Sequence, residues 1–148
     1  MKTVVVDIDG TIADITHRLP YVKNKKKDWK TFFDLCDKDS PIPDIIQLVK
    51  DLYLSGYRIV FFTGRREVIR EKTIEWLQKN LPFLDKYDVD FRGKSDYRND
   101  SVIKEEMLYD YFDNPKEDIF LVLDDRDRVV EMWRKNGIRC LQVKNGNY

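Results

Sequence analysis

The chain has neither the excess of charge nor the cysteine content that marks some specialised classes of protein. Its 148 residues carry 27 basic and 27 acidic side chains, so the formal net charge is zero. Any contact with a polyanion must therefore come from a local cluster of Arg and Lys, because no overall field exists to attract one. Only two cysteines occur, Cys36 and Cys140. They offer neither a metal-ligand spacing nor a disulfide framework, and this favours a reducing, cytoplasmic setting.

Long apolar runs are also missing. No stretch approaches the roughly 20 residues of a membrane span, so we expect no contact with a membrane. We also expect no signal peptide, because Lys2 is followed at once by a three-valine strand that ends in acid.

The sequence does contain an alternation of strand-like and helix-like patterns. Strands are expected at residues 3–6, 58–63, 87–91, 119–123 and 138–143, and helices from Pro43 to about Gly56 and over 67–80, 100–112 and 127–136. This alternation predicts an α/β fold, a Rossmann-like three-layer sandwich with a mainly parallel five-stranded sheet. We expect one domain over residues 1–148. Residues 12–40, with a short helix over 28–36, would form a small cap above the carboxyl edge of the sheet.

The most informative motif is Asp7-Ile8-Asp9-Gly10-Thr11, which directly follows the apolar run Val4-Val5-Val6. Three consecutive valines indicate a strand buried on both faces. Two carboxylates then emerge at the carboxyl end of that strand, where open α/β sheets bind their ligands. Asp-Gly alone is an ordinary turn signal, so this motif indicates a functional site only in combination with the other motifs expected near it.

Three further motifs are expected at the same edge of the sheet. Thr63-Gly64-Arg65 follows the second strand, and the backbone N–H groups and hydroxyl of such a turn can bind phosphate oxygens. Lys104 lies near the start of a helix. Asp124-Asp125 directly follows the strand at 119–123, and the repulsion between adjacent acids is relieved best by a cation. Oxygen ligands beside a phosphate favour magnesium.

Together these residues resemble the haloacid dehalogenase superfamily of phosphatases. Longer stretches resemble the 3′-phosphatase domains of phage polynucleotide kinase-phosphatases. The similar stretches are His17–Tyr21, Gly64–Arg65, Arg92, Tyr97–Asp100, Val102–Glu106, Leu123–Arg134 and Cys140–Val143. Because the chain has no G-x-x-x-x-G-K-[ST] phosphate loop, the resemblance implies the phosphatase half without kinase activity.

The resemblance implies a polynucleotide 3′-phosphatase with these roles. Asp7 would be the nucleophile that forms an aspartyl-phosphate, and Asp9 the general acid and base, which requires a pKa above the roughly 3.9 of free aspartate. Thr63 and Lys104 would hold the phosphoryl oxygens. The expected Mg²⁺ ligands are Asp7, Asp9 through its carbonyl, and Asp124 or Asp125. The expected substrate-binding residues are Arg18, Gly64, Arg65, Arg92 and Arg98.

Several alternatives remain open from the sequence. The substrate could be a mononucleotide or another small phosphomonoester, and a receiver-like signalling domain shares the layout, although its phospho-accepting aspartate would follow the third strand. RNA or DNA preference and a separate kinase or ligase partner also remain open, as does a helix-capping role for one of Asp124 and Asp125. The aromatic side chains Trp29, Phe32 and Phe33 are interpreted as packing residues, and the lysines at 23–27 as solvated.

Overall fold

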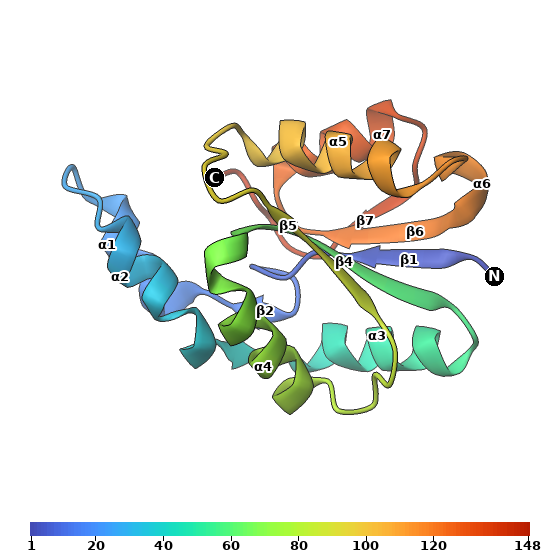
Figure 1. Cartoon of the computed structure of the whole chain (residues 1–148), viewed down its shortest axis with the longest axis horizontal. Coiled ribbons are helices and arrows are strands. Elements are labelled where there is room, and N and C mark those ends of the chain that lie inside the picture. Colours follow the sequence, from blue (N-terminus) through green and yellow to red (C-terminus); the bar gives the residue numbers. More distant parts are fainter.

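A five-stranded parallel sheet lies at the centre of the computed structural model, which describes residues 1–148 (Figure 1). The strands are β1 (Thr3–Val6), β4 (Arg58–Arg66), β5 (Asp88–Arg92), β6 (Ile119–Asp124) and β7 (Cys140–Gln142). Their order is β5-β4-β1-β6-β7, and every neighbouring pair is parallel. The expected α/β fold with a mainly parallel five-stranded sheet is confirmed.

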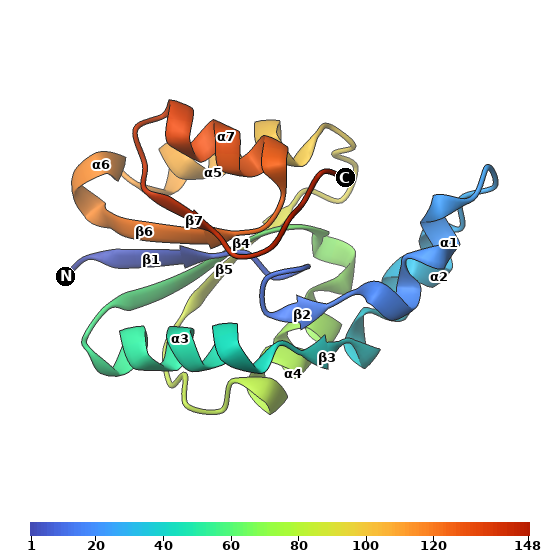
Figure 2. The ribbon, with the colours of Figure 1, turned by 180° about the vertical axis from the view of Figure 1, so that it is seen from behind.

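Helices cover both faces of this sheet (Figures 1 and 2). One face packs against α3 (Pro43–Leu54) and α4 (Arg70–Asn80), and the other against α5 (Asp100–Tyr111) and α7 (Asp127–Lys135). Alternate residues of one strand serve the two cores: Val4 and Val6 face α3 and α4, whereas Val5 faces α5 and α7. This two-sided burial explains why the strands are continuous apolar runs in the sequence.

The element boundaries follow local signals with a few exceptions. Pro43 occupies the first turn of α3, and Gly56, with a φ of +99°, follows its end. The second strand was expected to end at Thr63, but β4 continues to Arg66, because pairing with β5 resumes at Arg66 and Arg92 after a shift in register. The last strand is shorter than expected, and a short helix, α6 (Pro115–Asp118), precedes β6.

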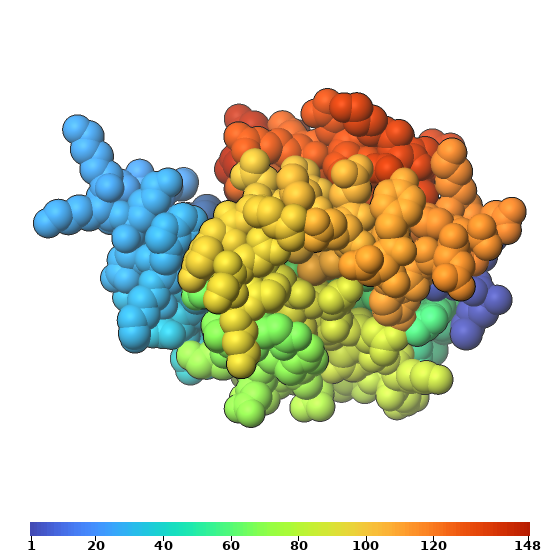
Figure 3. Space-filling view, turned by 45° about the horizontal axis from the view of Figure 1, so that its top comes forward, coloured from blue at the N-terminus to red at the C-terminus, as the bar shows by residue number.

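Residues 12–40 form a segment of short elements that stands out beyond the carboxyl ends of the strands (Figures 1 and 3). The elements are β2 (Ala13–Asp14), η1 (Thr16–Arg18), α1 (Pro20–Lys23), α2 (Trp29–Asp34), η2 (Cys36–Lys38) and β3 (Ser40–Pro41). The antiparallel pair β2–β3 returns the chain to the sheet. We refer to residues 12–40 as the cap.

The short helix expected over residues 28–36 is present as α2, whose N-cap Asp28 accepts a hydrogen bond from the Thr31 amide at 3.0 Å. The interpretation of its aromatic side chains as packing residues is only partly correct. Phe32 and Cys36 are buried, whereas Trp29 is 49% exposed. None of the helices combines the length and the apolar character that crossing a membrane requires.

Candidate active site

Three buried carboxylates meet at the carboxyl ends of β1 and β6. Asp7 follows β1, Asp124 ends β6 and Asp125 comes next, and one oxygen of each lies within 4.8 Å of the others. The loop after Asp7 turns at Gly10, whose φ is +82°. A Cβ at Gly10 would collide with the Asp125 carboxylate, so glycine is needed here for conformation and for space.

Lys104 reaches this cluster from the neighbouring helix α5. Its buried Nζ donates hydrogen bonds to Asp7 at 2.7 Å and to Asp124 at 3.0 Å. The Thr11 hydroxyl donates to the second oxygen of Asp7 at 3.0 Å. The Asp7 carboxylate is thereby held in one orientation by two donors.

One lysine does not balance three acids. Burial, followed by the charge of Asp124, raises the pKa of Asp7 well above its usual value, against the opposing effect of Lys104. Burial likewise raises the pKa of Asp125. Burial alone would lower the pKa of Lys104, but Asp124 and Asp7 outweigh it and raise that pKa. An excess of buried negative charge on hard oxygen donors fits a small divalent cation such as Mg²⁺.

The two members of the Asp124–Asp125 pair have different surroundings. Asp124 accepts hydrogen bonds from Lys104, from the Trp133 indole at 3.3 Å and from the Asp125 amide at 2.9 Å. The Asp125 carboxylate accepts one from the Tyr148 hydroxyl. The alternative that one aspartate caps the following helix is wrong, because the N-cap position of α7 is Arg126 and has no side-chain cap.

Asp9 lies beside the carboxylate cluster and is held by two arginines. Its Oδ1 accepts hydrogen bonds from Arg18 at 2.8 Å and from Arg65 at 2.7 and 3.0 Å. Burial alone would raise the pKa of Asp9, but the charges of Arg65 and Arg18 outweigh it and lower that pKa to about 2. The expectation of a raised pKa is therefore wrong for the protein without substrate.

A residue that the sequence analysis missed, Asp39, completes this arrangement from the end of the cap. Its buried carboxylate accepts two hydrogen bonds from Arg18, both at 2.8 Å, and one from Arg65 at 3.1 Å. His17 Nε2 lies 2.6 Å from the same group. We call Asp9, Arg18, Asp39 and Arg65 the arginine clamp. It joins the cap to the sheet through buried ion pairs.

The arginines expected to bind substrate are all bound to other parts of the protein. Arg18 and Arg65 are buried in the clamp. Arg92 donates to the Gly64 carbonyl at 2.8 Å and to Asp100, which joins β4 to the start of α5. Arg98 is paired with Asp96 and Glu106 on the surface.

The Thr63-Gly64-Arg65 turn is part of the irregular end of β4. The Thr63 hydroxyl is buried and accepts a hydrogen bond from the Arg65 amide at 3.1 Å. A Cβ at Gly64 would come within 2.5 Å of the Asp100 carboxylate, so this glycine permits the close packing of β4 and α5.

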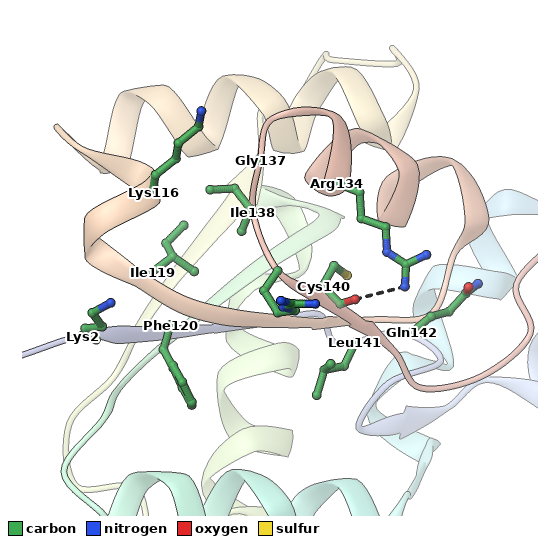
Figure 4. A pocket seen from close by; sticks show the side chains of 11 residues that line it. Lys2, Lys116, Ile119, Phe120, Arg134, Gly137, Ile138, Cys140, Leu141 and Gln142 are labelled. Atoms are coloured by element: carbon green, nitrogen blue, oxygen red, sulfur yellow. Dashed lines mark hydrogen bonds between the residues drawn. The ribbon is translucent and has the colours of Figure 1, made fainter.

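A cleft of about 730 Å³ opens onto these residues. Every predicted site residue except Arg18 and Thr63 lines it. Side chains of the cap, among them Leu19, Trp29 and Phe33, line its outer part. A second cavity, of about 770 Å³, lies beside β6 and β7 (Figure 4). It is lined by no carboxylate and by none of the predicted site residues.

The whole chain, residues 1–148, matches the family model described as the polynucleotide kinase PNKP phosphatase domain. A protein of Autographa californica nuclear polyhedrosis virus, described as a bifunctional polynucleotide kinase/RNA ligase, is 29% identical over 136 residues, which cover 90% of this chain and 18% of that protein. A guanine nucleotide-binding protein-like alpha-10 subunit of Dictyostelium discoideum is 25% identical over 83 residues, 56% of this chain and 22% of that protein. The chain thus spans about a fifth of the length of these curated relatives.

Solved structures are also similar to this chain. A chain of the Pnkp1/Rnl/Hen1 RNA repair complex is similar with a TM-score of 0.83 and 30% identity, covering 99% of this chain and 43% of that chain. The class C acid phosphatase of Bacillus anthracis with tungstate bound shares the fold, with a TM-score of 0.69, 17% identity, and coverage of 100% and 69%. The family match removes the receiver-like alternative. The chain belongs to the PNKP phosphatase-domain family of haloacid dehalogenase-like phosphatases and is a phosphomonoester hydrolase.

Proposed function

We propose that this domain is a Mg²⁺-dependent polynucleotide 3′-phosphatase that acts in the end repair of nucleic acid, RNA in the first place. The observation that carries the proposal is the buried cluster of Asp7, Lys104, Asp124 and Asp125 at the inner end of the cleft. The choice of substrate is supported by the family, and by relatives described as a polynucleotide kinase/RNA ligase and as part of an RNA repair complex. From the same relatives we infer that kinase and ligase activities work alongside this domain.

In the proposed reaction, a carboxylate oxygen of Asp7 attacks the phosphorus atom while the bond to the 3′ oxygen of the substrate breaks. The product of this step is an aspartyl-phosphate on Asp7. Lys104 and Thr11 hold the carboxylate in place, and Lys104 favours its ionised form against the effect of burial. Lys104, and Thr63 at the end of β4, are proposed to hold the other phosphoryl oxygens.

Asp9 is proposed to give a proton to the departing 3′ oxygen and then to remove one from the water that hydrolyses the aspartyl-phosphate. With a pKa of about 2, it carries no proton of its own near neutral pH. A phosphate monoester has its second pKa at about 6, so the substrate monoanion can bring the proton. We infer that the phosphate attracts Arg65, which lines the cleft, and that Asp9 becomes basic enough to accept this proton.

Mg²⁺ fits the oxygen donors of Asp7 and Asp125, with Asp124 beside them and the Asp9 carbonyl as a further candidate ligand. We favour Asp125 as the direct ligand, because four donors already occupy the Asp124 carboxylate: Lys104, Trp133 and the amides of Asp125 and Arg126. The ion would supply positive charge that offsets the repulsion between the anionic nucleophile and the phosphate.

The proposal is tested by phosphate release from one oligonucleotide sequence carrying either a 3′- or a 5′-phosphate, and from a nucleoside 3′-monophosphate. Each substrate is assayed with Mg²⁺ and with EDTA, and Asp7→Asn serves as the inactive control. We expect the 3′-phosphorylated oligonucleotide to be hydrolysed best, and only with Mg²⁺. Equal rates on the oligonucleotide and the mononucleotide would instead support a phosphatase of small phosphomonoesters.

A further inference from the structure

Two large aromatic side chains face the outer part of the cleft and have no role in the proposed reaction. Trp29, on helix α2 of the cap, is 49% exposed, and Tyr97, in the loop after β5, is 79% exposed. Both line the cleft that leads to the carboxylate cluster. The cap and this loop lie next to each other at the same end of the molecule (Figure 3).

These two aromatic side chains are connected by a row of packed groups. The Trp29 ring is stacked on Phe33, with centroids 5.9 Å apart and planes 23° apart. The Arg66 guanidinium lies 5.7 Å from the centre of the Phe33 ring and 5.5 Å from that of Tyr97. It also donates a hydrogen bond to the Lys94 carbonyl at 3.1 Å. The row Trp29–Phe33–Arg66–Tyr97 therefore extends from the cap to the loop after β5, and we call it the aromatic row.

Packing of the cap accounts for only part of the Trp29 surface: the ring also meets Phe32 edge-on, with centroids 5.7 Å apart, yet 49% of the residue remains exposed. The same helix provides Phe32 for that purpose, which is buried and lies under the Arg18 guanidinium at 4.4 Å. The other two tryptophans, Trp76 and Trp133, are buried in the cores. Apolar surface that remains open beside a cleft is typical of a binding site.

Positive charges accompany the aromatic row. Lys23 and Lys27 line the same cleft, and the Lys27 ammonium lies 5.8 Å from the centre of the Trp29 ring. The hydrogen bonds of Arg66 go to neutral groups, so its charge is not neutralised by an acid. Aromatic faces next to uncompensated cations are the combination by which proteins bind single-stranded nucleic acid, since rings stack on bases and cations contact phosphates.

We propose that the aromatic row binds the single-stranded end of the substrate, with bases stacked on Trp29 and Tyr97 and the backbone phosphates next to Arg66 and Lys27. Bases inside a duplex are already stacked on their neighbours, so we expect the row to favour a single-stranded end, in which successive bases can offer their faces. This inference rests on the proposed 3′-phosphatase function and adds how the strand is recognised.

The test compares three substrates: a single-stranded 3′-phosphorylated oligonucleotide, the same oligonucleotide with abasic terminal residues, and glycerol 2-phosphate. The variants are Trp29→Ala, Trp29→Phe and Tyr97→Ala. Tyr109→Ala is the matched control, because Tyr109 is 56% exposed on α5 and lies outside the cleft. Base stacking is worth roughly 1–3 kcal/mol per base. We therefore expect Trp29→Ala to lower kcat/KM for the base-bearing oligonucleotide about tenfold relative to the abasic one, mainly through KM.

Trp29→Phe retains a ring and should keep most of this preference, and Tyr97→Ala should lower it without disturbing the packing of the cap. An unchanged preference in both alanine variants would overturn the proposal, as would an equal loss in Tyr109→Ala. If wild-type enzyme does not prefer the oligonucleotide to glycerol 2-phosphate, the proposed function itself fails. Binding is read independently from tryptophan fluorescence, since Trp29 is the one exposed tryptophan. Quenching by the oligonucleotide should disappear in Trp29→Phe, and quenching that persists there would contradict the proposal.

Discussion

The substitution Asp39→Asn tests whether the arginine clamp stabilises the protein. The change keeps the size of the side chain and removes one buried negative charge. In the wild-type protein this carboxylate accepts three hydrogen bonds from Arg18 and Arg65. In the variant, both buried guanidinium groups would depend on Asp9 alone for a negative partner.

The expected magnitude follows from the burial of the group. Removing one partner of a buried ion pair costs about 3–5 kcal/mol, because the remaining charge stays in a medium of low polarity. For a domain of this size, each kcal/mol lowers Tm by about 2–4 °C. We therefore expect Asp39→Asn to lower Tm by roughly 10 °C.

Thermal unfolding followed by circular dichroism measures the effect, and Asp37→Asn is the matched control. Asp37 is two residues away, is partly exposed, and lies 4.0 Å from the ammonium of Lys72. Such an exposed pair contributes at most about 1 kcal/mol, so the control should melt close to wild type. A Tm for Asp39→Asn that equals that of the control would refute the argument that the buried clamp stabilises the fold.

Three further predictions concern the catalytic groups. Asp7→Asn should lower phosphate release at least about a thousandfold while the circular dichroism spectrum stays that of the wild type; a variant within tenfold of wild type would rule out the covalent mechanism. Burial raises the pKa of Asp125, so ionisation of this carboxyl lowers the stability of the folded protein as pH rises through the folded-state pKa. Asp125→Asn should therefore raise Tm in EDTA at pH 7 but not below about pH 4, where the carboxyl is protonated in both states. Added Mg²⁺ should stabilise the wild type more than this variant, and equal stabilisation would remove Asp125 from the metal site. Because Asp9, with a pKa of about 2, carries no proton near neutral pH, the proton is expected to come from the substrate monoanion. The pH profile of kcat/KM should therefore have a falling limb above the second pKa of the substrate phosphate, about 6. A phosphorothioate substrate, whose second pKa differs, should shift the pH of this limb. A limb at the same pH for both substrates would show that the proton comes from the enzyme.

Much of the fold could be predicted because its signals are local. The runs at residues 3–6 and 119–123 are apolar without interruption, as expected for strands buried on both faces. Parallel strands end at the same edge of a sheet, so the acids that follow them were expected to meet there. The structure places Asp7, Asp124 and Asp125 together in this way.

The arginine clamp could not be predicted, because its contacts depend on how the cap folds back. Arg18 meets Asp39 across 21 residues, and Arg65 meets Asp9 across 56. Sequence shows that these residues are charged but not which charges become partners. The pKa of Asp9 was misjudged for the same reason, since it depends on the two arginines that contact its carboxylate. The exposure of Trp29 was missed because helical spacing alone places it on the same face as Phe32.

The pairing of charges also explains how a protein without net charge can act on a polyanion. Five arginines near the cleft are already bound to acids: Arg18 and Arg65 in the clamp, Arg92 and Arg126 with Asp100, and Arg98 with Asp96 and Glu106. These pairs build the site and cancel in the overall charge. The uncompensated cation of Arg66, with Lys23 and Lys27, lies at the outer part of the same cleft. These cations would attract phosphates to the route that leads to Asp7.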